Sequence, residues 1–360
     1  MSLNASQIHA FFPPEQLPFL ARLKRRVAKT RPYAGLKILH NIPLTMETLP
    51  KIDVLLQGGA ELTVTSSTFM TPNPTAAAVL RAADVTLQIE HDFEDDFDIC
   101  MDCCGELLDQ VTPRIGMVEL TKTGSLRYRA RSDLSYPVIS VDESAVKNLE
   151  TLLGTGDGFL RAFRELTGEC VADKAFLLFG YGKVGQGIAH ALSRYTRDIA
   201  VVELDAGLLK KAAADGYGPI AGGDKRAVEN AAASAFAVVT ATGQKGVVSA
   251  SYDSKAIKKA AYLANMGGED EFGEAFTTDE VLVDKLPINF AIPQPTLIRY
   301  LDPVFYAHNL AIELLRAGEL RAGVYSFPDH VAEAIVEEWL SIFGTGGDAM
   351  VARKALSGTL

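Results

Sequence analysis

Membrane-spanning segments and export signals are missing from this sequence. It contains no run of about 18 apolar residues, the length that a membrane-spanning helix needs, and its first five residues do not join a basic region to an apolar one. Cysteine is also scarce, and the four cysteines, Cys100, Cys103, Cys104 and Cys170, suit a reducing compartment better than a disulfide framework. We therefore expect a cytoplasmic protein with no membrane partner.

Positive charge is in deficit as well. The chain has 35 Lys and Arg against 45 Asp and Glu, and its formal net charge of −10 argues against nucleic acid as a partner. No metal site is expected, because the CxxC spacing of Cys100 and Cys103 has no second pair to complete four zinc ligands. The same spacing invites a redox interpretation, but buried small residues in a strand and turn are favoured. A small molecule is the expected partner.

A glycine-rich turn after an apolar run is the most informative feature that is present. The letters FLLF at residues 176–179 lead into GYGKVG at residues 180–185, and an amphipathic segment follows. This order predicts a strand, a tight turn and a helix. Gly180 and Gly182 let the backbone turn and approach a pyrophosphate, and Gly185 lets the helix pack closely on its strand. The free N–H groups of the helix N-terminus then face the phosphates.

An acidic residue completes this fingerprint. A second strand ends at Glu203, about 20 residues after the turn, where a carboxylate can accept hydrogen bonds from a ribose diol and would repel a 2′-phosphate. NAD is therefore predicted rather than NADP, and a structural glycine turn in another α/β protein is the alternative. Two later strand ends carry small or hydroxylic residues, for which ordinary turn chemistry is the alternative. The residues of this region predicted to bind NAD are Gly180, Gly182, Lys183, Val184, Gly185, Glu203, Thr240, Thr242, Gly243, Asn265, Met266 and Gly267.

Short apolar runs alternate with helical stretches throughout the chain, which indicates parallel sheets. The length of 360 residues fits two domains, so we predict an α/β protein with two doubly wound parallel sheets, the C-terminal one in an NAD-binding Rossmann domain. The predicted division is a substrate or catalytic domain at 1–150, an NAD-binding domain at 151–303, and C-terminal helices and a frayed tail at 304–360. Helices from about residue 304 could pack back on the first domain. The predicted strands are 36–39, 61–65, 86–89, 99–101, 116–118, 138–140, 176–179, 199–202, 237–240 and 262–265.

Several motifs together resemble the S-adenosylhomocysteine hydrolase (adenosylhomocysteinase) family. Residues 180–187, GYGKVGQG, are similar to its GYGDVGKG, and residues 240–243, TATG, to its TTTG. More specific are VDESAVK at 141–147, similar to VNDSVTK, and GMVELTKTG at 116–124, similar to GISEETTTG. The resemblance extends from about residue 36 to 270.

The resemblance implies a two-domain enzyme that keeps NAD bound, oxidises a ribose 3′-hydroxyl, eliminates a group and returns the hydride. By position, Lys147 matches a family lysine that helps the proton transfer, and Glu150 falls near the aspartate that acts with it. Thr121, Lys122 and Thr123 match threonines that contact NAD from the other domain, with Lys122 in place of the middle one. A homodimer or homotetramer is also implied.

The departures from the family pattern fall in the half that handles adenosine. Its DDGGD segment reads DCCGE at 102–106, so Cys103 replaces the second aspartate, and Leu120 replaces the second glutamate of SEETTTG. The histidine of the family's GHFD segment aligns with Gly268, and that of GHP with Asp302. A water-addition step that relies on those histidines would be hard to run.

Five side chains are candidates for catalysis: Lys147, Glu150, Asp102, Glu119 and His40. Lys147 is either a general base with a pKa lowered by burial or a solvated helix lysine. Glu150, three residues on, either shares its helix face and tunes it or forms a surface ion pair. Asp102 and Glu119 either bind a substrate amine or hydroxyl at strand ends or cap a turn, and His40 is either a substrate ligand or a satisfied buried histidine.

We hypothesise an NAD-dependent enzyme, oxidoreductase in type, that acts on a small polar substrate other than S-adenosylhomocysteine. Lys147 would be the acid or base and Glu150 would tune it. One alternative is a true S-adenosylhomocysteine hydrolase with substituted catalytic groups. Another is a catalytically silent NAD-binding protein.

Overall fold

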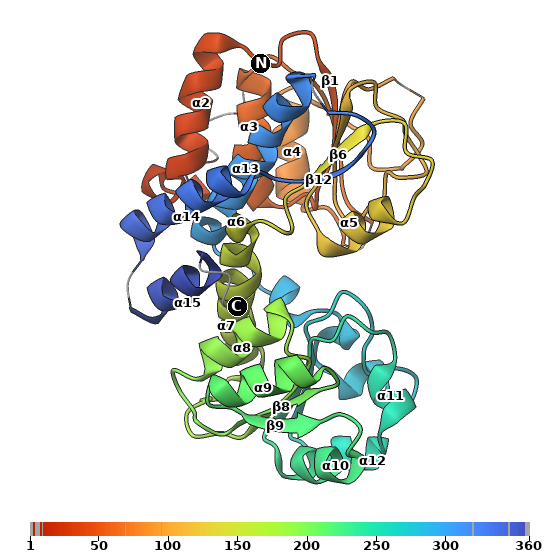
Figure 1. Ribbon diagram of the computed structural model, residues 1–360, viewed down its shortest axis with the longest axis vertical. Helices are drawn as coiled ribbons and strands as arrows, with labels where there is room; N and C mark the ends of the chain where they lie inside the picture. Colours follow the sequence, from red (N-terminus) through yellow and green to blue (C-terminus); the bar gives the residue numbers. More distant parts are fainter. Residues whose placement is uncertain are drawn as a thin grey trace. The chain divides into compact units, whose positions relative to one another are not determined.

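The structure is a computed structural model that describes residues 3, 8, 10–68, 70–94, 96–318, 320–344 and 346–356. The chain divides into two compact units, Met1–Leu149 with Ile298–Leu360, and Glu150–Leu297. Each unit is built around a parallel sheet with helices (Figure 1), which confirms the predicted α/β class. The expectation about an export signal concerns mostly residues outside the described set. No helix in the described ranges is long and apolar enough to cross a membrane.

The first unit contains a seven-stranded sheet in the order β12-β6-β5-β4-β1-β2-β3. Every pairing in it is parallel. The central strands are buried on both faces, which is why they read as short apolar runs. The strands are β1 (Lys37–Asn41), β2 (Glu61–Thr65), β3 (Thr86–Leu87), β4 (Ile99–Asp102), β5 (Gly116–Glu119), β6 (Pro137–Ser140) and β12 (Gly323–Ser326).

Helices α2, α3 and α13 lie side by side in this unit (Figure 1). Helix α13 begins at Ile298 and includes Pro303, although the sequence predicted a start after that proline. Proline removes the N–H that would bond the carbonyl of Arg299, and the indole N–H of Trp339 donates to that carbonyl instead at 2.8 Å. The helices are α2 (Pro18–Thr30), α3 (Leu49–Gln57), α4 (Pro74–Ala82), α5 (Lys122–Arg129), α13 (Ile298–Arg316), α14 (Asp329–Phe343) and α15 (Gly346–Leu356).

The second unit contains a five-stranded parallel sheet in the order β11-β10-β7-β8-β9. This is the strand order of half a Rossmann fold with two further strands, and apolar clusters cover both faces. The strands are β7 (Phe176–Phe179), β8 (Ile199–Glu203), β9 (Gly218–Ala221), β10 (Ala237–Thr240) and β11 (Tyr262–Asn265). The helices are α7 (Thr155–Thr167), α8 (Lys183–Leu192), α9 (Ala206–Ala214), α10 (Lys225–Ser234), α11 (Val247–Ser251) and α12 (Ser254–Ile257).

The two units are joined through an irregular helical segment, and one local expectation needs correction. The segment contains a π-helical turn at Leu149–Gly154, between α6 (Ala145–Asn148) and α7. The chain end was expected to be frayed, yet α15 occupies residues 346–356. Residues 357–360 lie outside the described part.

Candidate functional site

The glycine turn at the end of β7 has the geometry of a phosphate-binding loop. Gly180 has a φ of +91°, and a Cβ there would clash with the backbone of Ala241. Gly185 packs so closely on the carbonyl of Gly180 that no side chain fits between helix α8 and its strand. These contacts explain why glycine is needed at both positions.

The start of α8 is open to a ligand. Gly182 precedes the first helical residue, Lys183, and no described side chain caps the helix there. A Cβ built on Gly182 would meet no described atom within 4 Å, so the space beside this residue is open. Val184 follows in the first turn and is partly buried. A pyrophosphate fits this place, because the N–H groups of a helix N-terminus and the helix dipole both favour an anion.

The predicted acid lies directly beside this turn. Glu203 ends β8, and its carboxylate accepts the N–H of Tyr181 at 2.8 Å and those of Leu204 and Asp205 at 2.7 and 3.1 Å. The group is therefore held in position at the edge of the sheet, with lone-pair capacity left for a diol. The structure thus brings the glycine turn and Glu203 together as the fingerprint predicts.

The ends of β10 and β11 form the other half of this edge. Thr240 and Asn265 are register partners, and the threonine hydroxyl donates to the amide oxygen of Asn265 at 2.9 Å. After β10, the backbone N–H groups of Thr242 and Gly243 donate to the carboxylate of Glu271 at 2.8 and 2.6 Å. Glu271 is fully buried, and burial raises its pKa. No periodic or spacing signal in the sequence marks this acid, which holds the predicted cofactor loop in place.

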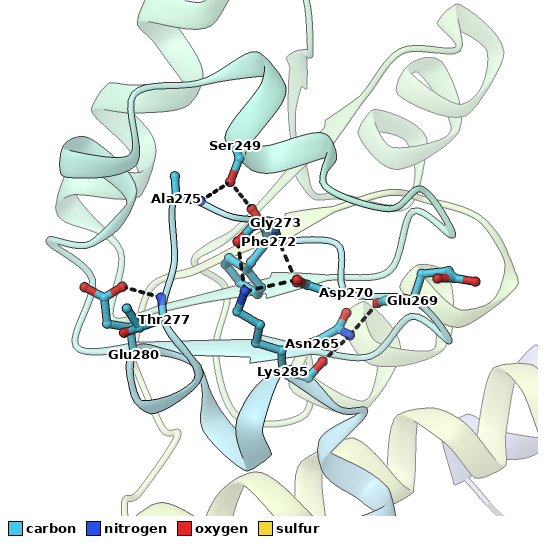
Figure 2. A network of polar contacts seen from close by, with 10 residues as sticks. All are labelled: Ser249, Asn265, Glu269, Asp270, Phe272, Gly273, Ala275, Thr277, Glu280 and Lys285. Carbon is cyan, nitrogen blue, oxygen red and sulfur yellow. Dashed lines mark hydrogen bonds and ion pairs between the residues drawn. The ribbon is translucent and has the colours of Figure 1, made fainter. Parts of the chain in front are cut away.

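A second network holds the loop that follows β11 (Figure 2). The side-chain amide of Asn265 donates to the carbonyls of Glu269 and Lys285 at 2.7 Å each. The Lys285 ammonium pairs with Asp270 at 3.0 Å and donates to the carbonyl of Gly273 at 2.9 Å. The loop that carries the predicted cofactor residues Met266 and Gly267 is therefore tied to the sheet at both ends.

In the first unit, Asp102 lies at the carboxyl end of β4 and is fully buried. One oxygen accepts the amide of Asn41 at 3.0 Å and the N–H of Cys103 at 2.8 Å, and the other accepts the N–H of Leu107 at 3.1 Å and the hydroxyl of Tyr128 at 2.6 Å. Burial raises its pKa to about 6 despite these bonds. Its four lone-pair directions are engaged in holding the loop, and its contact with substrate stays a prediction.

Glu119 lies beside it at the end of β5 and is also fully buried. Its carboxylate accepts the N–H and hydroxyl of Thr121 at 2.6 and 2.7 Å and the N–H of Gly105 at 3.1 Å. Burial, and then the nearby charge of Asp102, raise its pKa to about 8. Thr121 in turn caps α5, whose first residues Lys122 and Thr123 are exposed. Whether these three reach NAD stays a prediction.

Three buried bases gather among β1, α3 and α13. His40 has no hydrogen-bond partner for either ring nitrogen within the described residues. Burial, the charge of Lys51 and that of His308 lower its pKa well below the ordinary value. Burial also lowers the pKa of Lys51, whose ammonium nitrogen lies 3.5 Å from the sulfur of Met101. Lys51 was not among the predicted site residues, because the sequence around it shows only a helical pattern.

Lys147 lies on α6 and is 4% exposed, so the interpretation as a solvated helix lysine is wrong. Its charge lowers the pKa of His308 and that of Cys103, which places it near both groups. Glu150 lies in the π-helical turn and is half-buried. The α-helical spacing by which these two residues were expected to share a face therefore does not hold, and the role of Glu150 stays a prediction. Among the residues described, no group of His, Cys, Asp and Glu could hold a metal ion.

This chain is similar to proteins that hydrolyse S-adenosylhomocysteine or S-inosylhomocysteine, according to their names. The model of the S-adenosyl-L-homocysteine hydrolase NAD binding domain matches residues 151–289, which confirms NAD as the cofactor predicted for that region. The S-inosyl-L-homocysteine hydrolase of Methanopyrus kandleri is 24% identical over 382 residues, covering 92% of this chain and 88% of its own. The adenosylhomocysteinase of Thermoplasma acidophilum is 25% identical over 382 residues, with 92% of each chain covered. That of Sulfurisphaera tokodaii is 30% identical over 278 residues, which span 70% of this chain and 64% of the relative.

Proposed function

We propose that this chain is a divergent member of the S-adenosylhomocysteine hydrolase family, whose NAD binding domain its residues 151–289 match, and that it is an NAD-dependent enzyme that oxidises a small polar substrate other than S-adenosylhomocysteine. Asp302 carries this proposal. Its carboxylate accepts the N–H groups of Phe19 and Leu20 at 2.9 Å each and is fully buried, so it works as the cap of α2. The family's second histidine position, Gly268, has no side chain at all. Neither position offers an acid or base for adding water.

The cofactor half supports the same proposal. The N–H groups at the start of α8 would bind the pyrophosphate of NAD, and Glu203 would bind the adenosine ribose. NAD, when bound, accepts a hydride from a substrate carbon. The residues of this chain would position the dinucleotide and slow its release into solvent.

We assign the accompanying proton transfer to Lys147, with Glu150 tuning it. Lys147 is almost fully buried, so water does not compete for the substrate's hydroxyl proton. Burial and the charge of Lys51 lower the pKa of His308, so this ring, which also feels the charge of Lys147, stays neutral near pH 7 and adds no positive charge beside Lys147. His40, with two unbonded ring nitrogens, is a second candidate to contact substrate.

The test combines ligand identification with turnover. Mass spectrometry of the native purified protein is expected to find retained NAD, and NADH absorbance is expected to rise with a polar alcohol or hydroxy acid. Gly182→Asp places a negative charge where the pyrophosphate would lie and is expected to abolish NAD retention. Ala213→Asp adds the same charge to an exposed site near the C-terminal end of α9 and is expected to leave retention unchanged.

Two outcomes would replace the proposal. Release of homocysteine from S-adenosylhomocysteine or S-inosyl-L-homocysteine, seen as a new free thiol, would identify a hydrolase with substituted catalytic groups. Bound NAD with no turnover of any substrate in the panel would identify a silent NAD-binding protein. We further propose a homodimer or homotetramer in the cytoplasm, and light scattering after size-exclusion chromatography measures the number of subunits.

A further inference from the structure

Two adjacent cysteines lie at the carboxyl end of β4, beside the buried pair Asp102 and Glu119. The sulfurs of Cys103 and Cys104 are 3.8 Å apart, and both are free thiols. Cys103 is 3% exposed, whereas Cys104 is half-buried and can meet a small solute. Two thiols that already touch need little movement to form a bond.

We propose that Cys103 and Cys104 are a redox site that hydroperoxides oxidise to a reversible vicinal disulfide, and that this disulfide loosens the start of α5. The sequence alone favoured inert small residues at these positions. Neither the disulfide nor its effect on α5 rests on the proposed function.

The two thiols differ in a way that suits the chemistry. The hydrogen bond from the Cys103 thiol lowers the pKa of Cys104, whereas the hydrogen bond to Cys104 and burial raise that of Cys103. The thiolate is the nucleophile, so the accessible Cys104 would attack first. With hydrogen peroxide, its sulfur bonds one oxygen as the O–O bond breaks, and the departing hydroxide takes a proton to become water; an organic hydroperoxide would release its alcohol instead.

The second step uses the neighbouring thiol. The sulfur of Cys103 attacks that of Cys104, the S–O bond of the sulfenic acid breaks, and a second water leaves with the thiol proton. Two thiols thus lose two electrons, and the hydroperoxide, named here as the oxidant, gains them. A dithiol reductant reverses the change.

The backbone around the pair links the bond to α5. Bringing the sulfurs from 3.8 Å to about 2 Å turns the peptide between them. The N–H of that peptide belongs to Cys104 and donates to the Thr121 hydroxyl at 2.9 Å. The same hydroxyl oxygen caps α5 by accepting the N–H of Gly124 at 3.2 Å. The next peptide is also tied to α5, since the Arg127 side chain donates to the carbonyl of Cys104 at 3.0 Å.

Cys104 is held in a conformation that a side chain seldom adopts. Its φ is +63°, in the left-handed region that favours glycine. The structure therefore stores some strain at the residue whose peptide must turn. A rearrangement that releases this strain lowers the free-energy cost of forming the Cys103–Cys104 disulfide.

The experiment treats the reduced full-length protein with hydrogen peroxide and measures intact mass, thiol number and peptide mass spectra. The expected result is the loss of two thiols and two hydrogens, located at Cys103 and Cys104 and restored by dithiothreitol. Cys103→Ser is expected to stop at a sulfenic acid on Cys104 that dimedone traps, and Cys104→Ser is expected to give neither product. Cys170→Ser, at an exposed site in the second unit, is expected to form the disulfide as the unaltered protein does.

Hydrogen–deuterium exchange tests the effect on α5 without any substrate. Oxidation is expected to speed exchange in the first turn of α5 about fivefold, as the loss of an N-cap bond would. The proposal is overturned if four thiols survive peroxide, if the disulfide joins another pair, or if α5 exchanges at an unchanged rate in the oxidised protein. A protein that shows these changes but no turnover at all would contradict the proposed function only.

Discussion

Asp302 shows how a buried carboxyl group can serve as a structural cap. Its carboxylate accepts two N–H groups at the start of α2 from a distant part of the chain, and burial raises its pKa to about 7. We predict that Asp302→Ala lowers the free energy of unfolding of the first unit by about 2 kcal/mol, because two backbone donors lose their cap. Urea unfolding followed by fluorescence of Trp339, the single tryptophan, measures this change.

Asp302→Asn is the matched control for this prediction. Asparagine keeps one acceptor oxygen, so about half of the loss is expected to return. Equal losses in the two variants would mean that the charge, and not the capping bonds, stabilises α2. Equal stability of Asp302→Ala and the unaltered protein would remove the structural explanation of this residue.

Sequence motifs with fixed spacing predict the cofactor-binding residues. Residues whose roles depend on contacts with distant segments of the chain are missed. Gly182 and Glu203 are visible because a turn, a helix start and a strand end recur at fixed spacing. Glu271 and Lys51 are not visible, because the partners that give each its environment come from segments far away in the sequence. For the same reason the sequence shows Cys104 as a small residue but not its left-handed backbone.

At the scale of elements, the ten predicted strands are all present, with ends that differ by at most two residues. The two strands that were missed, β9 and β12, both lie at sheet edges. Their residues are exposed or half-buried, and each strand contains glycine, so no apolar run marks them. Helix α5 was missed because its sequence is polar and begins from the cap that Thr121 provides.

Helix α13 tolerates an internal proline for a reason that can be tested. The carbonyl of Arg299, four residues before Pro303, accepts the indole N–H of Trp339 from α14. We predict that Trp339→Phe costs about 1–3 kcal/mol, because that carbonyl loses its donor and the larger ring is lost from a buried site. Circular dichroism during urea unfolding measures this cost, since the variant lacks tryptophan.

A double-mutant cycle separates the hydrogen bond from the packing. Pro303→Ala restores an N–H that can bond the Arg299 carbonyl within the helix, so Trp339→Phe is expected to cost less in that background. An identical cost in both backgrounds would show that the indole acts through packing alone.

At the scale of the whole molecule, the sequence locates the cofactor region and the family but not the balance of charge inside the first unit. Buried acids and buried bases there have opposite effects on the pH dependence of stability. The pKa values of Asp102, Asp302 and Glu119 are raised to about 6, about 7 and about 8. The folded chain therefore holds protons that the unfolded chain has released, and stability falls as pH rises from about 4 to 8. The division of work between the two units stays a prediction.

Lys51 acts in the opposite direction and over a higher pH range. Burial lowers its pKa well below 10.5 in the folded chain, so the unfolded chain binds one more proton up to about pH 10.4. The stability due to this group therefore rises with pH, by up to about 1.4 kcal/mol per unit. Above about pH 9 the three raised carboxyl groups are largely ionised in both states. The raised pKa values of the buried thiols Cys100 and Cys103 act against the lysine there, so its contribution is the difference in slope between the unaltered protein and a variant that lacks Lys51.

We predict that Lys51→Met stabilises the first unit at pH 8 and that its advantage shrinks steadily toward pH 10. The thioether chain fills a similar volume beside Met101 and has no charge to lose on burial. Urea unfolding at several pH values, followed through Trp339, gives the slope. Lys29→Met removes the same charge from an exposed site on α2 and should keep the slope of the unaltered protein. If both variants shift stability by an amount that does not change with pH, Lys51 is protonated in the folded chain, and a buried partner must hold its charge.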